Sequence, residues 1–160
     1  MDIMRLGRTN LRVSRSGFGA LPIQRIPFDE AKAILRKAYD NGINFFDTAR
    51  AYTNSEEKIG YALADVRNDI ILATKSKAGD RKTLLKDLET SLRNLKTDHV
   101  DILQLHNPAE LPDPEDPESS YAGLLEARQK GLIRFLGVTN HKIGNALQAA
   151  TSGRYDTVQF

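Results

Sequence analysis

The sequence predicts an α/β fold, specifically a (β/α)8 TIM barrel that is incomplete over residues 1–160. Strand-like and helix-like segments alternate along the chain, and this alternation is typical of parallel strands joined by right-handed helical crossovers. Polar residues also stand at or just after the ends of four successive strand-like runs, positions that converge on one face of a barrel. Eight strands need roughly 250 residues. We therefore expect one domain with a hairpin, six parallel strands and five helices, truncated after the sixth strand.

The first elements are a hairpin, a short strand and a helix. Residues 3–14 hold the turn Gly-Arg-Thr-Asn between two extended runs, which predicts an antiparallel hairpin. Residues 16–19 are expected to form a short strand whose glycines allow a ligand close to the backbone. From Asp29 onward apolar residues recur at helical spacing, and Asn41-Gly42 ends this helix.

Strands and helices alternate over the rest of the chain, with a proline-rich acidic loop expected at 107–117. An open, doubly wound sheet would show the same alternation. Such a sheet normally carries a glycine-rich phosphate turn, which Pro22 interrupts here, so a barrel is favoured. The expected strands are 43–46, 69–74, 100–105, 133–138 and 157–160, and the expected helices are 56–64 (capped by Thr53 or Asn54), 81–95, 119–130 and 142–151.

Composition argues against several classes of protein. A formal net charge of +2 is too small to indicate nucleic-acid or membrane-surface binding. No cysteine is available for disulfides or thiolate metal sites. No stretch approaches the roughly 18 apolar residues of a membrane span, and the first residues lack the apolar core of a signal peptide. We expect a cytoplasmic protein without nucleic-acid or membrane partners.

Four polar residues at the strand ends could form a proton-relay site: Asp47, Tyr52, Lys75 and His106. Tyr52 would be the general acid, because a neighbouring ammonium lowers the pKa of a phenol and Lys75 would supply that charge. Asp47 would hold Lys75 and keep it protonated, while His106 would orient a substrate carbonyl. Such a site lacks a hydride, so an organic cofactor would have to provide it.

Each of the four residues also has a purely structural interpretation. Asp47 could belong to a turn or a helix cap, and Tyr52 could be a surface aromatic. Lys75 could be a solvated strand end, and His106 a core histidine. Their shared position at carboxyl ends of strands favours the catalytic interpretation.

Other polar residues of the chain could also belong to a functional site. Arg50 could pair with Asp47 or face an anionic substrate, although a solvated loop arginine is the simpler interpretation. The acidic run at 113–118 lacks the glycine turn and ligand spacing of a calcium loop. His99 and His141 are not spaced as a zinc pair with His106, so no metal site is expected.

Several motifs resemble those of the aldo-keto reductase family, in order and with matching gaps over essentially the whole chain. They are RLGRTNLRVS (5–14), GINFFDTARAY (42–52), ATKS (73–76), LQLHN (103–107) and GVTN (137–140). The stretch from Gly19 to Arg25 is similar to a microbial branch in which some members carry a C-terminal iron–sulfur segment, nothing of which is in these residues.

The resemblance implies a barrel that binds NADPH (or NADH) and reduces small aldehydes or ketones. It implies a catalytic tetrad of Asp47, Tyr52, Lys75 and His106. It also implies cofactor contacts from Gly19, Ala20, Asp47, Thr139, Asn140 and Gln159.

Three departures from the family pattern stand out. Thr139 replaces a common serine and Thr53 a common glycine. The last two strand–helix units, with their phosphate-binding loops, are absent from residues 1–160. The expected function is NAD(P)H-dependent carbonyl reduction with Tyr52 as general acid. The alternative is a non-catalytic fragment or scaffold without a cofactor site. For the isolated chain we expect little activity, and self-association through open barrel edges.

Overall fold

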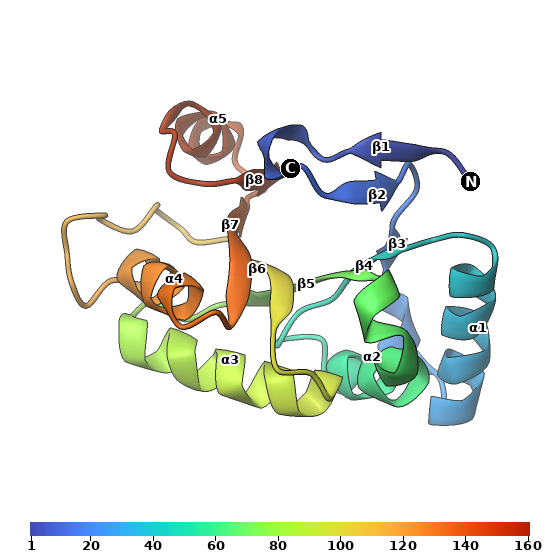
Figure 1. Cartoon of the computed structure of the whole chain (residues 1–160). Helices are drawn as coiled ribbons and strands as arrows, with labels where there is room; N and C mark the ends of the chain where they lie inside the picture. The colour runs from blue at the N-terminus through green and yellow to red at the C-terminus, as the bar shows by residue number, and fades with distance from the viewer.

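The computed structural model describes residues 1–160 as a curled parallel sheet with helices on its outer face (Figure 1). The strands are β1 (Ile3–Arg5), β2 (Arg12–Ser14), β3 (Phe18–Gly19), β4 (Phe45–Asp47), β5 (Ile71–Ser76), β6 (Val100–His106), β7 (Ile133–Thr139) and β8 (Thr157–Gln159). The α-helices are α1 (Phe28–Asp40), α2 (Ser55–Leu63), α3 (Arg81–Leu95), α4 (Ser120–Gln129) and α5 (Ile143–Thr151).

The main sheet has six strands in the order β3-β4-β5-β6-β7-β8, all parallel. This confirms the expected hairpin followed by six parallel strands and five helices. Because neighbours in sequence are neighbours in the sheet, the carboxyl ends of all six strands lie along one edge. The edge strands are β3 and β8.

The hairpin β1–β2 forms a separate antiparallel sheet across the concave side of the main sheet (Figure 1). Leu11 and Val13 pack there against Ala73 and Ile102. Arg8, in the 3-10 turn between the two hairpin strands, donates hydrogen bonds to the carbonyl oxygens of Gly153 and Tyr155 just before β8. The hairpin therefore links the amino-terminal segment to the last strand.

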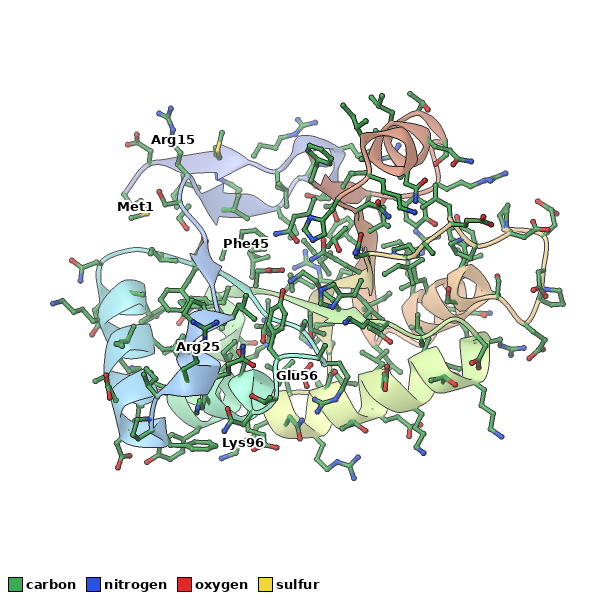
Figure 2. The ribbon with its side chains drawn as sticks, turned by 180° about the vertical axis from the view of Figure 1, so that it is seen from behind. Met1, Arg15, Arg25, Phe45, Glu56 and Lys96 are labelled. Carbon is green, nitrogen blue, oxygen red and sulfur yellow. The ribbon has the colours of Figure 1, made fainter.

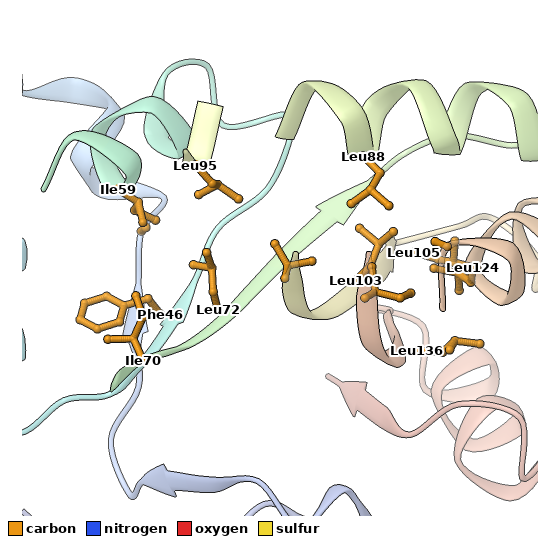
Figure 3. Packing of buried hydrophobic residues seen from close by; sticks show 14 of the residues in the cluster. Phe46, Ile59, Ile70, Leu72, Leu88, Leu95, Leu103, Leu105, Leu124 and Leu136 are labelled. Carbon is orange, nitrogen blue, oxygen red and sulfur yellow. The ribbon is translucent and has the colours of Figure 1, made fainter. Parts of the chain in front are cut away.

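The main core lies between the sheet and its helices (Figure 3). Successive side chains of a strand point to opposite faces, so one set packs against the helices and the alternate set lines the concave side. Gly60 permits the close approach of α2 to α3, since a Cβ there would collide with the carbonyl oxygen of Asn94. The fully buried members of the helix-side set include Phe46, Leu72, Leu103, Leu105 and Leu136.

Some boundaries differ from the sequence prediction. The segment 64–69 forms a 3-10 helix, so β5 begins later than expected and includes Lys75. Two further short 3-10 helices, at 7–9 and 22–25, were also missed. Asn54 occupies the N-cap position of α2 but its side chain accepts no capping hydrogen bond, so that prediction was wrong in its chemistry. None of the five α-helices combines the length and apolar character needed to cross a membrane.

Candidate active site

The four predicted catalytic side chains come from three strands rather than four. Asp47 ends β4, Lys75 is near the end of β5 and His106 ends β6. Tyr52 lies in the loop after β4, which continues the β4–β5 pairing: the amides of Thr48 and Arg50 donate to carbonyl oxygens of β5. The loop therefore has a defined position beside the strand that carries Lys75.

A buried carboxylate fixes the other end of this loop. Glu56, on α2, is labelled in Figure 2. It is buried and accepts hydrogen bonds from Arg50, Thr74 and Asn94. Arg50 is therefore paired with Glu56, which differs from the predicted pairing with Asp47 and from a fully solvated loop arginine. Glu56 is also one of the residues that sequence reasoning missed.

Lys75 and Asp47 form a buried ion pair. Lys75 is 3% exposed, and its Nζ donates to Asp47 Oδ2 at 2.5 Å and to the Thr48 carbonyl oxygen at 2.7 Å. Burial raises the pKa of Asp47 and lowers the pKa of Lys75, and the attraction between the two groups opposes both shifts. Asp47 thus holds Lys75 as expected, while burial works against the charge on both partners.

Tyr52 and His106 lie next to this pair. The Nζ of Lys75 is 5.2 Å from the centroid of the Tyr52 ring, and the Tyr52 and His106 rings meet edge-on at 5.6 Å between centroids. The structure therefore brings all four residues together. No hydrogen bond joins the Tyr52 hydroxyl to Lys75, and the two interact across the face of the ring.

The expected lowering of the Tyr52 pKa is not observed. Burial and the negative charge of Asp47 raise the pKa of the Tyr52 phenol. The prediction assumed that Lys75 would dominate, but the charge of Lys75 is balanced by Asp47 at the same site. The phenol is consequently protonated at neutral pH.

His106 is a neutral imidazole at pH 7. Burial lowers the pKa of His106 to about 4, and repulsion from the nearby cations adds to the effect. Its Nδ1 atom is buried and has no hydrogen-bond partner in the protein. Since buried polar atoms are normally paired, this unpaired nitrogen is an exception at the site.

The residues expected to contact a cofactor flank this cluster. Gly19 pairs with Asp47, and the Ala20 amide donates to the Asp47 carbonyl oxygen at 2.8 Å. Thr139 ends β7, and its hydroxyl accepts from the Asn107 amide but donates to no protein group. The Gln159 side chain lines the same cavity as Asp47 and favours the charged form of its carboxyl.

Asn140 is placed differently from the rest of this set. Its side-chain nitrogen donates to the Pro108 carbonyl oxygen at 2.8 Å, and its side-chain oxygen accepts from the Lys142 amide at 2.8 Å. Both ends of this amide therefore hold the loop between β6 and α4 to the start of α5. One N–H and one oxygen lone pair of this amide make no hydrogen bond within the protein, although Asn140 is only 2% exposed.

Two more residues at the site escaped sequence reasoning. Gln104 donates to Asp47 Oδ1 at 3.1 Å, and its position two residues before His106 in a strand was an available signal. Lys58 is 1% exposed and donates to the carbonyl oxygens of Ile23, Gln24 and Ile26. Nothing in its helical pattern distinguishes Lys58 from a surface lysine.

A cavity of about 170 Å³ opens beside Asp47 on the concave side of the sheet. Its polar lining comes from Asp47, Gln104, Thr157 and Gln159, and its apolar lining includes Leu6 of the hairpin and Phe45 of β4. Of the four acid–base groups, Asp47 borders this internal space directly, and the other three lie next to Asp47 or its ion pair.

Known proteins are similar to this chain in sequence and in fold. L-galactose dehydrogenase of Arabidopsis thaliana is 35% identical over 154 residues, covering 87% of this chain and 48% of the relative. The holo form of an aldo-keto reductase from Bacillus halodurans matches with a TM-score of 0.82 and 29% identity, covering all of this chain and 58% of its own. An aldo-keto reductase from Klebsiella pneumoniae in complex with NADPH matches with a TM-score of 0.79 and 25% identity. This match covers 91% of the present chain and 52% of the Klebsiella chain.

These structural matches confirm the barrel class, and the chain spans about half the length of the curated relative described above. The model of the Aldo/keto reductase family matches residues 15–160, which is nearly the whole chain. The chain therefore belongs to the aldo/keto reductase family.

Proposed function

We propose that this site reduces aldehyde or ketone carbonyls with a nicotinamide cofactor, NADPH or NADH, and that Tyr52 is the general acid. The observation that carries the proposal is the convergence of Tyr52 and His106 on the buried pair of Lys75 and Asp47. Relatives named as reductases, and a neighbour named as an NADPH complex, support the same activity.

In this proposal Tyr52 gives its proton to the alkoxide that forms from the carbonyl. The phenol is protonated at neutral pH and can donate, but its raised pKa makes it a weaker acid than a free phenol, so proton transfer needs the phenolate to be stabilised. The ammonium of Lys75, 5.2 Å from the ring centroid, stabilises the phenolate that remains. Asp47 fixes the position of this ammonium through the 2.5 Å ion pair.

His106 orients the carbonyl group. A neutral imidazole can donate one hydrogen bond, and the low pKa of His106 keeps the ring in this form at neutral pH. Its Nδ1 is buried without a partner in the protein, which leaves the hydrogen-bonding capacity of the ring incompletely used and supports this role. The small-molecule carbonyl substrate is thus held between a hydrogen-bond donor and an acid.

A bound nicotinamide would supply the hydride that none of these side chains can provide. The free hydroxyl proton of Thr139 and the amide of Gln159 suit a carboxamide, and the backbone of Gly19 and Ala20 lies beside Asp47. Asn140 keeps one N–H and one oxygen lone pair for a carboxamide, while its two bonds to Pro108 and Lys142 position the neighbouring loop.

The test is Tyr52→Phe in the full-length protein, assayed with NADPH and NADH against small aldehydes and ketones. We expect turnover to fall by about 10²–10⁴-fold, the usual contribution of a positioned acid, while cofactor affinity is retained. Tyr61→Phe is the matched control, because it removes an exposed phenol that bonds Asp29 on the outer surface. Absence of cofactor binding in the unmodified protein would favour the alternative, a non-catalytic scaffold.

Self-association of the isolated chain is part of the same proposal. Strands β3 and β8 have no partner on their outer sides, and unpaired strand edges promote pairing with a second copy. Sedimentation of residues 1–160 should show dimers or larger species, and a monomer at all concentrations would contradict this. A cytoplasmic location is also proposed, to be checked by cell fractionation.

A further inference from the structure

Gln104 contacts Asp47 across an intervening strand. It is 4% exposed and lies on the same face of β6 as His106. Its Nε2 donates to Asp47 Oδ1 at 3.1 Å, while Asp47 Oδ2 accepts from Lys75 at 2.5 Å. The two oxygens of the carboxylate therefore have different donors, and the orientation of the carboxylate is determined from both sides.

The neighbouring residues leave room for this side chain. On one side Gln104 pairs with Gly137 of β7, which in turn pairs with Thr157 of β8. A Cβ at position 137 would lie 2.7 Å from Gln104 Cγ and 2.5 Å from Thr157 Oγ1, both closer than real Cβ contacts. On the other side, the residue of β5 paired with Asp47 is Ala73, whose side chain is a single methyl group.

We propose that Gln104 is a positioning residue that orients the Asp47 carboxylate toward Lys75 and favours its charged form, with Gly137 providing the space that this requires. The inference rests on the proposed function for its catalytic consequence. The hydrogen bond itself can be tested without turnover.

The surroundings of Asp47 allow the effect of Gln104 on the Asp47 carboxyl to be measured separately from the effects of its other neighbours. The titratable groups that face this carboxyl are Lys75 from β5 and Tyr52 from the loop after β4. The groups from β6 and β8, Gln104 and Gln159, are neutral amides. Hydrogen bonds to a carboxylate favour the charged form, so loss of the Gln104 amide should raise the pKa of Asp47.

The experiment is Gln104→Leu, which removes the donor while keeping a side chain of similar size. The Asp47 carboxyl is followed by ¹³C NMR as a function of pH, with Asp47→Asn used to identify its resonance. We expect the midpoint of its titration to rise by about one pH unit, the effect of one hydrogen bond to a charged group. The acid limb of the pH profile of kcat/KM should move in the same direction.

Two further variants separate positioning from simple packing. Ile102→Val shortens a buried neighbour on the same face of β6 that also borders Gly137, so it should lower stability without moving the Asp47 titration. Gly137→Ala displaces Gln104 without changing its chemistry, so it should shift the titration as Gln104→Leu does.

The outcomes are distinct for the two proposals. An Asp47 midpoint unchanged in both Gln104→Leu and Gly137→Ala would overturn the role of Gln104. If Gln104→Leu does not fold, the midpoint of the Asp47 titration in Gly137→Ala provides the test by itself. A shifted midpoint in a protein that reduces no carbonyl compound would retain the positioning role and refute the proposed function.

Discussion

Two carboxylates, Asp101 fully buried and Asp47 partly buried, stand at opposite ends of the sheet and have very different surroundings. Asp101, near the amino end of β6, is 1% exposed; its Oδ2 accepts from Arg67 and from the Leu72 amide, each at 2.9 Å. Its Oδ1 accepts from Arg134 at 2.5 Å. Asp47, at the carboxyl end of β4, shares its site with a single cation, two amides and a phenol.

The difference separates a structural cluster from a reactive one. No buried polar atom of the Asp101 cluster lacks a partner, whereas the site around Asp47 includes the unpaired Nδ1 of His106. Three groups of the tetrad besides His106 also have pKa values moved toward the neutral form by burial. Perturbed, incompletely paired groups that border a cavity are typical of functional sites.

The largest expected effect is the loss of stability in Asp101→Ala. Arg67 would keep a largely buried charge without its partner, and the Leu72 amide would lose its acceptor. We expect a loss of about 3–5 kcal/mol of unfolding free energy in urea denaturation. Asp98→Ala, an exposed neighbour, is the control and should change stability by about 0.5 kcal/mol or less. An equally small change in the stability of Asp101→Ala would contradict the distinction between a structural Asp101 cluster and a reactive Asp47 site.

Replacing both members of the pair at the other end should have the opposite sign. The pKa of Asp47 is raised from 3.8, so its charged form costs stability as pH rises through and above that value. The pKa of Lys75 is lowered from 10.5, so its charged form costs stability as pH falls below that value. Both costs are present at neutral pH.

The double variant Asp47→Leu with Lys75→Met should therefore be as stable as the unmodified protein or more stable, by about 1–4 kcal/mol. It should also lose carbonyl reduction. Urea denaturation at pH 7 measures the first effect and NADPH oxidation the second. A double variant much less stable than the unmodified protein would mean that the pair is structural, like the Asp101 cluster.

A smaller gain is expected at Thr53, which follows Tyr52. Its φ is +39°, a left-handed conformation that is rare for a β-branched residue and favours glycine. Thr53→Gly should stabilise the protein by about 1 kcal/mol through relief of this strain, as measured by thermal unfolding. Thr53→Ala keeps the strained backbone and removes only the exposed bond to Gln24, so it should not show the gain. Equal melting temperatures for the two variants would exclude strain as the cause.

A further effect concerns His106 and pH. Its pKa falls from 6.5 in the unfolded chain to about 4 in the folded protein, so the unfolded state binds more protons between these values. Stability should fall as pH decreases through this window, and less so in His106→Asn. Urea denaturation at several pH values between about 4 and 7 measures the difference. Identical pH dependence in both proteins would mean that His106 titrates normally.

Much of the fold, and the core of the site, could be predicted from the sequence pattern alone. Alternating strand and helix segments predicted the parallel sheet, and period-two alternation within strands put Lys75 and His106 on one face. The motif around residues 42–52 placed Asp47 and Tyr52 in the loop region of the same edge. These features depend on local sequence and on the common direction of parallel strands, which is why they could be predicted.

Partners and protonation states could not be predicted in the same way. The pairing of Arg50 with Glu56 and the burial of Lys58 depend on how α2 lies beneath the loops after β3 and β4. The reach of Gln104 to Asp47 depends on the register of three strands and on an empty position at Gly137. The raised pKa of Tyr52 comes from water excluded by the assembled site.

By itself, then, the sequence determined the class of fold and the types of reactive group along one edge of the sheet. Tertiary structure alone decided which donor meets each acceptor and which groups lose their charge. The physical reason is range: side-chain alternation and helix periodicity are local, whereas desolvation and ion pairing depend on atoms brought together from distant parts of the chain.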